Sequence, residues 1–240
     1  MKANIRPDSF RIQCLLFAAL ATLLFLLHGA TVVFTLDEGI ILDAAQRVLA
    51  GQKPYVDFFG YMSPGSYWLQ VLVFKLFGVS LFTARILPIT GWALQATLVF
   101  RLVDQFGSRR SAIVTLILYF TSQLCNAGTL TAHHRMDSGT LVLLAICLAL
   151  DARRLTSKWR WLISGILSAA AAVCTPTMAI VVVVTFIWLL LDRKDQGWLV
   201  YAGGVAATGL LAAAWIISEG TLLPSFNKCS GFRRTMRKST

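Results

Sequence analysis

The sequence is poor in charged residues and rich in apolar ones. Charged residues make up 14% of the 240 positions and hydrophobic residues 57%, and the mean hydropathy is +0.69. Soluble domains average roughly 25% charged and 45–50% apolar residues. One soluble core could not bury this much apolar surface. The composition therefore predicts an integral membrane protein that crosses the bilayer several times.

Acidic residues are especially scarce. The chain has 11 Asp and Glu against 22 Lys and Arg, which gives a net charge of +11. The cations lie in short clusters between apolar runs rather than in one basic patch, so the charge does not indicate nucleic-acid binding. In membrane proteins such clusters mark the loops that are held on the cytoplasmic side.

The cysteines lack the spacing of a metal site or a disulfide framework. No Cys-x-x-Cys motif and no Cys/His pairing occurs in the sequence, which argues against structural zinc and against a disulfide-stapled fold. The five cysteines are Cys14, Cys125, Cys147, Cys174 and Cys229. They are expected to be small packing residues, and none of them is assigned as a metal ligand.

The N-terminal apolar stretch is too long for a cleavable signal peptide. It runs from Ile12 to Leu36 behind Lys2, Arg6 and Arg11, whereas a signal has an apolar core of ~7–15 residues and a small-x-small cleavage site. We expect residues 1–11 to be cytoplasmic and the stretch to be the first membrane span.

Seven apolar runs approach the ~20 residues that a spanning helix needs. They lie at about 12–35, 84–104, 111–129, 135–151, 160–175, 176–191 and 197–218. We therefore predict an all-α fold, a polytopic bundle of seven spans within a domain of residues 12–220. The apolar stretch 67–82 is short and contains Lys75.

Charge decides how the stretch 67–82 is placed. Counting it as a span would move nine later cations from the inside to the outside, against the positive-inside rule. These are Arg101, Arg109, Arg110, Arg153, Arg154, Lys158, Arg160, Arg193 and Lys194. We expect 67–82 to lie in the outer interface, and Trp159, Trp161, Trp188 and Trp198 to gather at the cytoplasmic boundary.

The first outer loop, residues 36–83, opens with Asp37-Glu38-Gly39. Apolar residues then recur at helical spacing over 38–50, which predicts an amphipathic helix on the membrane surface that ends at Gly51. Asp37 at its N-terminal edge is either a helix cap or a base that accepts a proton from a substrate, and the two roles are compatible.

The rest of this loop is rich in proline, glycine and aromatic residues, which predicts ordered structure. Residues 51–68 form either a rigid connector or a wall of a substrate cleft, with Tyr55 and Asp57 as candidate contacts.

A second cluster, His133, His134, Arg135 and Asp137, lies at the mouth of a helical hairpin on the same side. The imidazoles and the guanidinium could hold a phosphate, and His with Asp could hold a metal. The alternative is interfacial snorkelling with an Arg–Asp pair. Charge at this depth is costly and tends to mark functional sites, which favours the first interpretation.

The first outer loop resembles a known family. The residues that carry the resemblance are Asp37-Glu38-Gly39, Ala44-Ala45, Leu49, Gly51, Pro54-Tyr55, Asp57-Phe58, Pro64-Gly65, Phe74, Leu76-Phe77-Gly78 and Arg85. In this order they resemble the N-terminal region of GT-C glycosyltransferases of the protein O-mannosyltransferase and aminoarabinose transferase type. The resemblance covers about residues 10–220 and includes an outer-loop Asp where Asp137 stands. Ser63 departs from it, because many relatives have a second proline there.

The resemblance implies a membrane transferase that moves a sugar from a polyprenyl-phosphate donor to a glycan, lipid or protein acceptor on the outer face. A bacterial inner membrane is the expected location. Asp37 corresponds to the catalytic base, with Glu38 beside it. Arg135 and the two histidines, or a divalent metal ion, would stabilise the departing phosphate. The choice between them stays open at this point.

The C-terminal segment 221–240 does not fit the predicted topology. It should be outside, yet it carries Lys228, Arg233, Arg234, Arg237 and Lys238. We expect a truncated or frameshifted product corresponding to the N-terminal half of a longer transferase, which would not turn over alone. The alternatives are a transporter subunit and a non-catalytic lipid-phosphate-binding fragment. A transporter would carry ionisable residues at mid-membrane and internal repeats.

Overall fold

The computed structural model describes residues 9–28, 36–124, 131–191 and 197–218, and the named elements of these segments are all helices. This confirms the all-α fold class. A helix overlaps each of the seven predicted runs. These helices are α1 (Ser9–His28), α5 (Ile86–Phe106), α6 (Arg109–Leu124), α7 (His134–Leu155), α8 (Lys158–Cys174), α9 (Ala179–Leu191) and α10 (Gly197–Ser218). A 3₁₀ turn, η2 (Pro176–Met178), separates α8 from α9.

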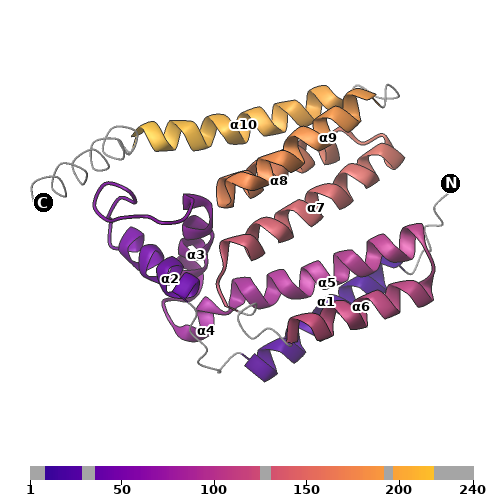
Figure 1. Cartoon of the computed structure of the whole chain (residues 1–240), viewed down its shortest axis with the longest axis horizontal. Coiled ribbons are helices and arrows are strands. Elements are labelled where there is room, and N and C mark those ends of the chain that lie inside the picture. Colours follow the sequence, from indigo (N-terminus) through magenta and orange to yellow (C-terminus); the bar gives the residue numbers. More distant parts are fainter. Residues whose placement is uncertain (1–8, 29–35, 125–130, 192–196, 219–240) are drawn as a thin grey trace, which may run out of the picture.

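The long helices lie side by side, and successive helices from α5 to α10 reverse direction (Figure 1). In the packing, α5 contacts α1, α6 and α7, and α8 contacts α7 and α10. Two helical stretches of the described chain are long and apolar enough by themselves to cross a membrane, Leu81–Phe106 and Gly197–Ser218. Arg11–Leu24 and Pro176–Leu191 are apolar but shorter.

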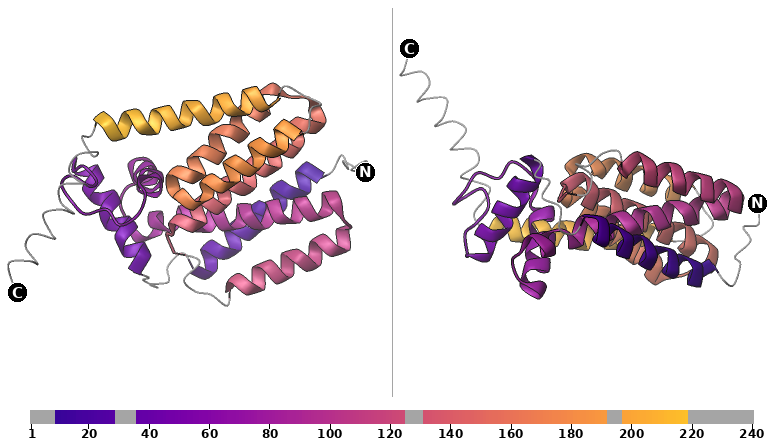
Figure 2. Two further views of the ribbon diagram at one scale, coloured as in Figure 1. Left: turned by 45° about the horizontal axis from the view of Figure 1, so that its top comes forward. Right: turned by 90° about the horizontal axis from the view of Figure 1, so that it is seen from below.

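Three shorter helices gather at one end of the bundle, opposite the start of α1 (Figures 1 and 2). They are α2 (Leu36–Leu49), α3 (Pro64–Phe77) and α4 (Leu81–Ala84). Proline at the first position starts α3, where a missing N–H costs nothing. Gly78 ends α3 with φ +79°, a conformation that side chains rarely adopt.

The predicted amphipathic helix is present as α2. Its apolar face, however, is buried against α3 and is not open to lipid as expected. Ile41, Ala44 and Ala45 pack with Tyr67 and Phe74 of α3. The reason is that the loop between the two helices folds back and brings α3 against that face. Exposed apolar side chains occur on α3, α4 and their junction, namely Leu72, Leu76, Phe77, Val79, Leu81 and Phe82, and also at Leu36, Phe59 and Tyr61.

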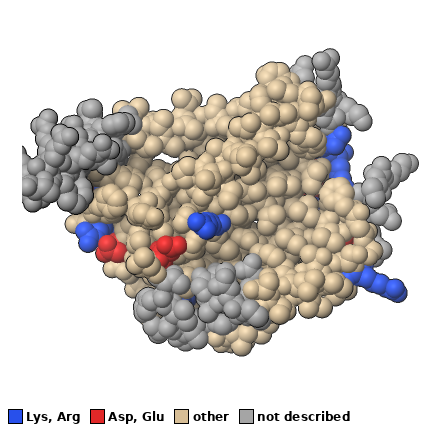
Figure 3. Space-filling view, in the orientation of Figure 1, with Lys and Arg blue, Asp and Glu red and all other residues tan. Residues whose placement is uncertain are grey.

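The opposite end carries aromatic side chains and paired cations. Trp161, Trp188 and Trp198 belong to one cluster, and the guanidinium of Arg153 lies 5.4 Å from the centre of the Trp188 ring. Arg101 forms an ion pair with Asp151. Figure 3 shows charged side chains toward the two ends of this face, while the surface over the middle of α8 and α10 carries none.

Candidate functional site

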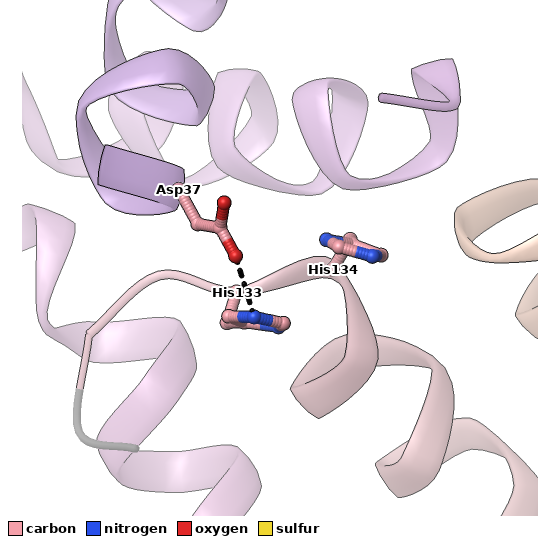
Figure 4. Close-up of side chains that lie close together, drawn as sticks. All are labelled: Asp37, His133 and His134. Carbon is pink, nitrogen blue, oxygen red and sulfur yellow. Dashed lines mark ion pairs between the residues drawn. The ribbon is translucent and has the colours of Figure 1, made fainter. Parts of the chain in front are cut away.

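The two outer loops meet at Asp37 and His133. Asp37 lies in the first turn of α2, and His133 is the residue that precedes α7. The Nε2 atom of His133 is 2.7 Å from Oδ2 of Asp37 (Figure 4). The carboxylate of Asp37 thus contacts the other loop, and both side chains remain partly open to solvent.

The position of His133 at the start of α7 fixes which nitrogen carries its proton. Its Nδ1 accepts the backbone N–H of Arg135 at 3.1 Å, in the way a helix cap does. A neutral imidazole that accepts through one nitrogen donates through the other. Nε2–H therefore donates to Asp37, and we call the two residues the Asp37–His133 dyad.

His134 stacks on His133, with ring centres 4.7 Å apart and planes 15° apart. Its Nδ1 is buried and has no hydrogen-bond partner in the described part of the chain. The hydroxyl of Thr175 donates to its carbonyl at 3.2 Å and ties it to the end of α8. Burial, with a smaller effect of His133, lowers the pKa of His134 below its ordinary value. Burial therefore favours the neutral form of His134.

Asp37, His133 and His134 each offer one ligand atom, and these atoms lie within 4.8 Å of one another. Two imidazoles and a carboxylate suit a divalent transition metal. A metal-bound histidine normally donates through its second nitrogen, whereas Nδ1 of His133 accepts an N–H. The observed hydrogen bonds thus match the dyad better than a metal centre.

Glu38, predicted as the second catalytic residue, is only 1% exposed. It forms an ion pair with Arg85, which joins α4 to α5. Its Oε1 also accepts the backbone N–H of Ala132 at 3.4 Å. Burial raises the pKa of Glu38, and Arg85 opposes that rise. The structure places this carboxylate inside the protein.

The other predicted site residues occupy different surroundings. Arg135 is exposed in the first turn of α7, and Asp137, in the same turn, lies beside Ser66 of α3. Tyr55 donates its hydroxyl to the Met62 carbonyl at 2.5 Å, and burial raises its pKa.

Asp57 acts within its own loop. Its Oδ2 accepts the backbone N–H of Lys53 at 2.7 Å. Together with the bond from Tyr55, this orders the loop between α2 and α3.

An apolar pocket of about 460 Å³ lies near this end of the bundle. Its walls come from α3, α7, α8 and α10, and include Trp68, Leu141, Cys174 and Trp215. Cys174 directly precedes Thr175, the residue that holds His134. The pocket therefore adjoins the segment that supports the dyad.

Sequence reasoning missed Arg85 and Thr175 as supports of the site. Arg85 was noticed only as part of the family resemblance, although a cation between two apolar helices is itself a signal of a buried ion pair. A threonine next to a helix-ending proline gave no such signal.

In the described part of the chain, helices that are apolar enough to cross a membrane and ionisable side chains that meet at the start of α7 are typical of a membrane-embedded enzyme or transporter. Residues 61–220 match the model of the family described as dolichyl-phosphate-mannose-protein mannosyltransferase, and the chain belongs to that family of GT-C-type membrane glycosyltransferases. The match includes α3 to α10 and the cluster at 133–137, while Asp37 and Glu38 precede it. No curated protein and no solved structure matches the chain.

Proposed function

We propose that the chain forms the outer-face site of a transferase that moves a sugar from a polyprenyl-phosphate donor to an acceptor hydroxyl, with Asp37 as the base. The observation that carries this proposal is the contact between Asp37 and His133, which joins two loops far apart in the sequence. A carboxylate that only capped α2 would need no partner from α7.

The dyad suits proton removal from the acceptor. Nε2–H of His133 occupies Oδ2 of Asp37 and orients the carboxylate, which leaves Oδ1 to take the hydroxyl proton. The acceptor oxygen then attacks the anomeric carbon of the sugar, and the bond from that carbon to the phosphate oxygen breaks.

The departing phosphate would be bound by the start of α7. The positive end of the α7 dipole lies there and favours anions. The exposed guanidinium of Arg135 and the imidazole of His134 would add donors at the same place. Tyr55, Asp57 and Asp137 would contribute to the cleft walls, since Tyr55 and Asp57 order the loop and Asp137 lies beside α3.

The apolar pocket and the exposed apolar side chains would contact the lipid part of the donor and the bilayer. The pocket beside Thr175 would accept part of a polyprenyl chain. We infer a multi-pass protein with a cytoplasmic N-terminus, because α1 and α5 to α10 alternate in direction and the α2–α4 group lies at the end that would face outward. The same arrangement leaves α3 and α4 in the outer interface, where their exposed apolar side chains would contact lipid.

Asp37→Asn tests the proposal in a longer relative that carries the same motifs, because this chain alone is not expected to turn over. The asparagine keeps the size of the side chain but cannot act as a base, so release of dolichyl phosphate from dolichyl-phosphate mannose should fall by about 10²–10⁴-fold. Asp43→Asn, on the exposed face of the same helix, should leave the rate unchanged. Retained activity in folded Asp37→Asn would contradict the proposed base.

Treatment with a chelator distinguishes between two interpretations of the site, the dyad and a metal centre. The proposal predicts that treatment with a chelator leaves the release rate unchanged. Loss of activity on chelation, with recovery on adding Mn²⁺ or Zn²⁺, would instead assign the three clustered ligand atoms to a cation and remove the dyad as the base.

A further inference from the structure

Glu38 and Arg85 form a buried ion pair directly beneath the dyad. Their side chains are 1% and 5% exposed. One oxygen of Glu38 accepts both from Arg85 and from the backbone N–H of Ala132. This carboxylate therefore links three segments: the start of α2, the junction of α4 with α5, and the chain that leads into α7.

The contacts between the two loops are in register. Asp37 contacts His133, and the next residue, Glu38, contacts Ala132, the residue before His133. Consecutive residues on a helix project about 100° apart. Glu38 accordingly points into the protein while Asp37 points to the partly open side, so a shift of Glu38 shifts Asp37 with it.

The burial of both charges makes the Glu38–Arg85 ion pair costly to separate. Separating Glu38 from Arg85 would leave a buried charge without its partner, which is strongly destabilising. Burial favours the neutral form of the Glu38 carboxyl and so raises its pKa, while the guanidinium of Arg85 favours the ionised form. Both groups are thus held in one arrangement.

We propose that Glu38 and Arg85 are positioning residues, whose ion pair fixes α2 against the chain at 131–133 and keeps Asp37 within hydrogen-bond reach of His133. The catalytic meaning of this role rests on the proposed function, since it supposes that Asp37 is the base. The geometric role can be measured without any reaction.

The measurement is the proton on Nε2 of His133 in the full chain, labelled with ¹⁵N-histidine in detergent micelles. The chain has three histidines, so His28→Gln, His133→Gln and His134→Gln assign the signals. A hydrogen-bonded Nε2 proton exchanges slowly with water and should be visible in the unchanged protein. Asp37→Ala removes the acceptor, so it gives the reference spectrum for a His133 Nε2 proton that is not hydrogen-bonded.

Glu38→Leu combined with Arg85→Met removes the buried charges and replaces them with apolar groups, which commonly preserves stability. We expect the double variant to lose the protected Nε2 proton, as Asp37→Ala does. Sugar transfer should slow by about 10²-fold, the scale of a 1 Å misplacement. Arg85→Lys, which keeps the charge, should fold and weaken the signal only in part.

The exposed ion pair of Asp43 with Arg47 on the same helix, 2.8 Å long, is the matched control. Asp43→Asn with Arg47→Gln should keep the protected proton and the rate. A protected proton that persists in the folded Glu38→Leu/Arg85→Met protein would overturn the proposal, as would its absence from the unchanged protein. If Asp37→Asn keeps full activity while the protected proton still depends on Glu38, only the proposed function fails.

Discussion

At the scale of single residues, adjacent residues make different contacts because their side chains project in different directions from a helix. Asp37 contacts His133 on the partly open side, and Glu38 lies inside with Arg85. The two histidines differ in the same way. Nδ1 of His133 accepts a backbone N–H, while Nδ1 of His134 is buried with no partner in the described segments. His134 is therefore the imidazole with a nitrogen still available to a ligand.

This difference predicts how donor binding depends on pH. In the free protein the pKa of His134 is lowered, and an adjacent anionic phosphodiester would raise it. Binding would then take up a proton, so affinity should rise as the pH falls from 8 to 6, by up to about tenfold per pH unit. A polyprenyl-phosphate sugar, ionised throughout this range, is the ligand to titrate.

The control for that titration is the remaining histidine. His134→Gln should flatten the pH dependence, and His28→Gln should retain it. Affinity that is independent of pH in the unchanged protein would argue against His134 as a phosphate ligand.

At the scale of elements, glycine permits the closest helix contact near the pocket. A Cβ atom at Gly204 of α10 would lie 2.3 Å from the carbonyl oxygen of Leu162, and one at Gly165 of α8 would lie 2.2 Å from that of Tyr201. Both obstacles are backbone atoms, which cannot move aside as a side chain can. Small residues at such crossings let helices in membranes approach closely.

Gly204→Ala should therefore destabilise the protein, by about 1–3 kcal/mol as for other overpacked sites. Gly203→Ala is the control, because a Cβ there meets nothing within 4 Å in the described structure, and alanine favours helix by up to about 1 kcal/mol. Thermal unfolding in one detergent compares them. Equal midpoints would show that α8 and α10 do not cross at this contact.

At the scale of the whole molecule, the alternating helices place the turns in two sets at opposite ends. The α5–α6 and α7–α8 turns lie at the end where α1 starts, and the α2–α4 group lies at the other (Figure 2). Because α3 and α4 stay at that end, they do not change the direction of the later helices. The cations near Trp188 then lie at the same end of the bundle as the start of α1.

Cysteine labelling tests this topology. Ser108→Cys and Ser157→Cys, each in a cysteine-free chain, should react with an impermeant maleimide only after the membrane is opened. Gln52→Cys, at the opposite end, should react in intact cells. Outward labelling of position 108 or 157 would contradict the seven-span topology.

The helices could be predicted from the sequence because each depends on a local pattern. Apolar runs and the cations of the turns locate the described parts of α1 and α5 to α10. The same reasoning found the residues that carry chemistry, since ionisable side chains are rare in a chain with 14% charged residues. It also predicted α2 as amphipathic.

The partners of these residues depended on the tertiary structure. Periodicity says that α2 has an apolar face, but the burial of that face against Tyr67 and Phe74 follows from how the chain returns to α3. Adjacent carboxylates are equivalent in the sequence. Only the packing of α2 against Ala132 and Arg85 makes Glu38 an internal anchor and brings Asp37 to His133, because contacts between distant segments are set by the shape of the whole bundle.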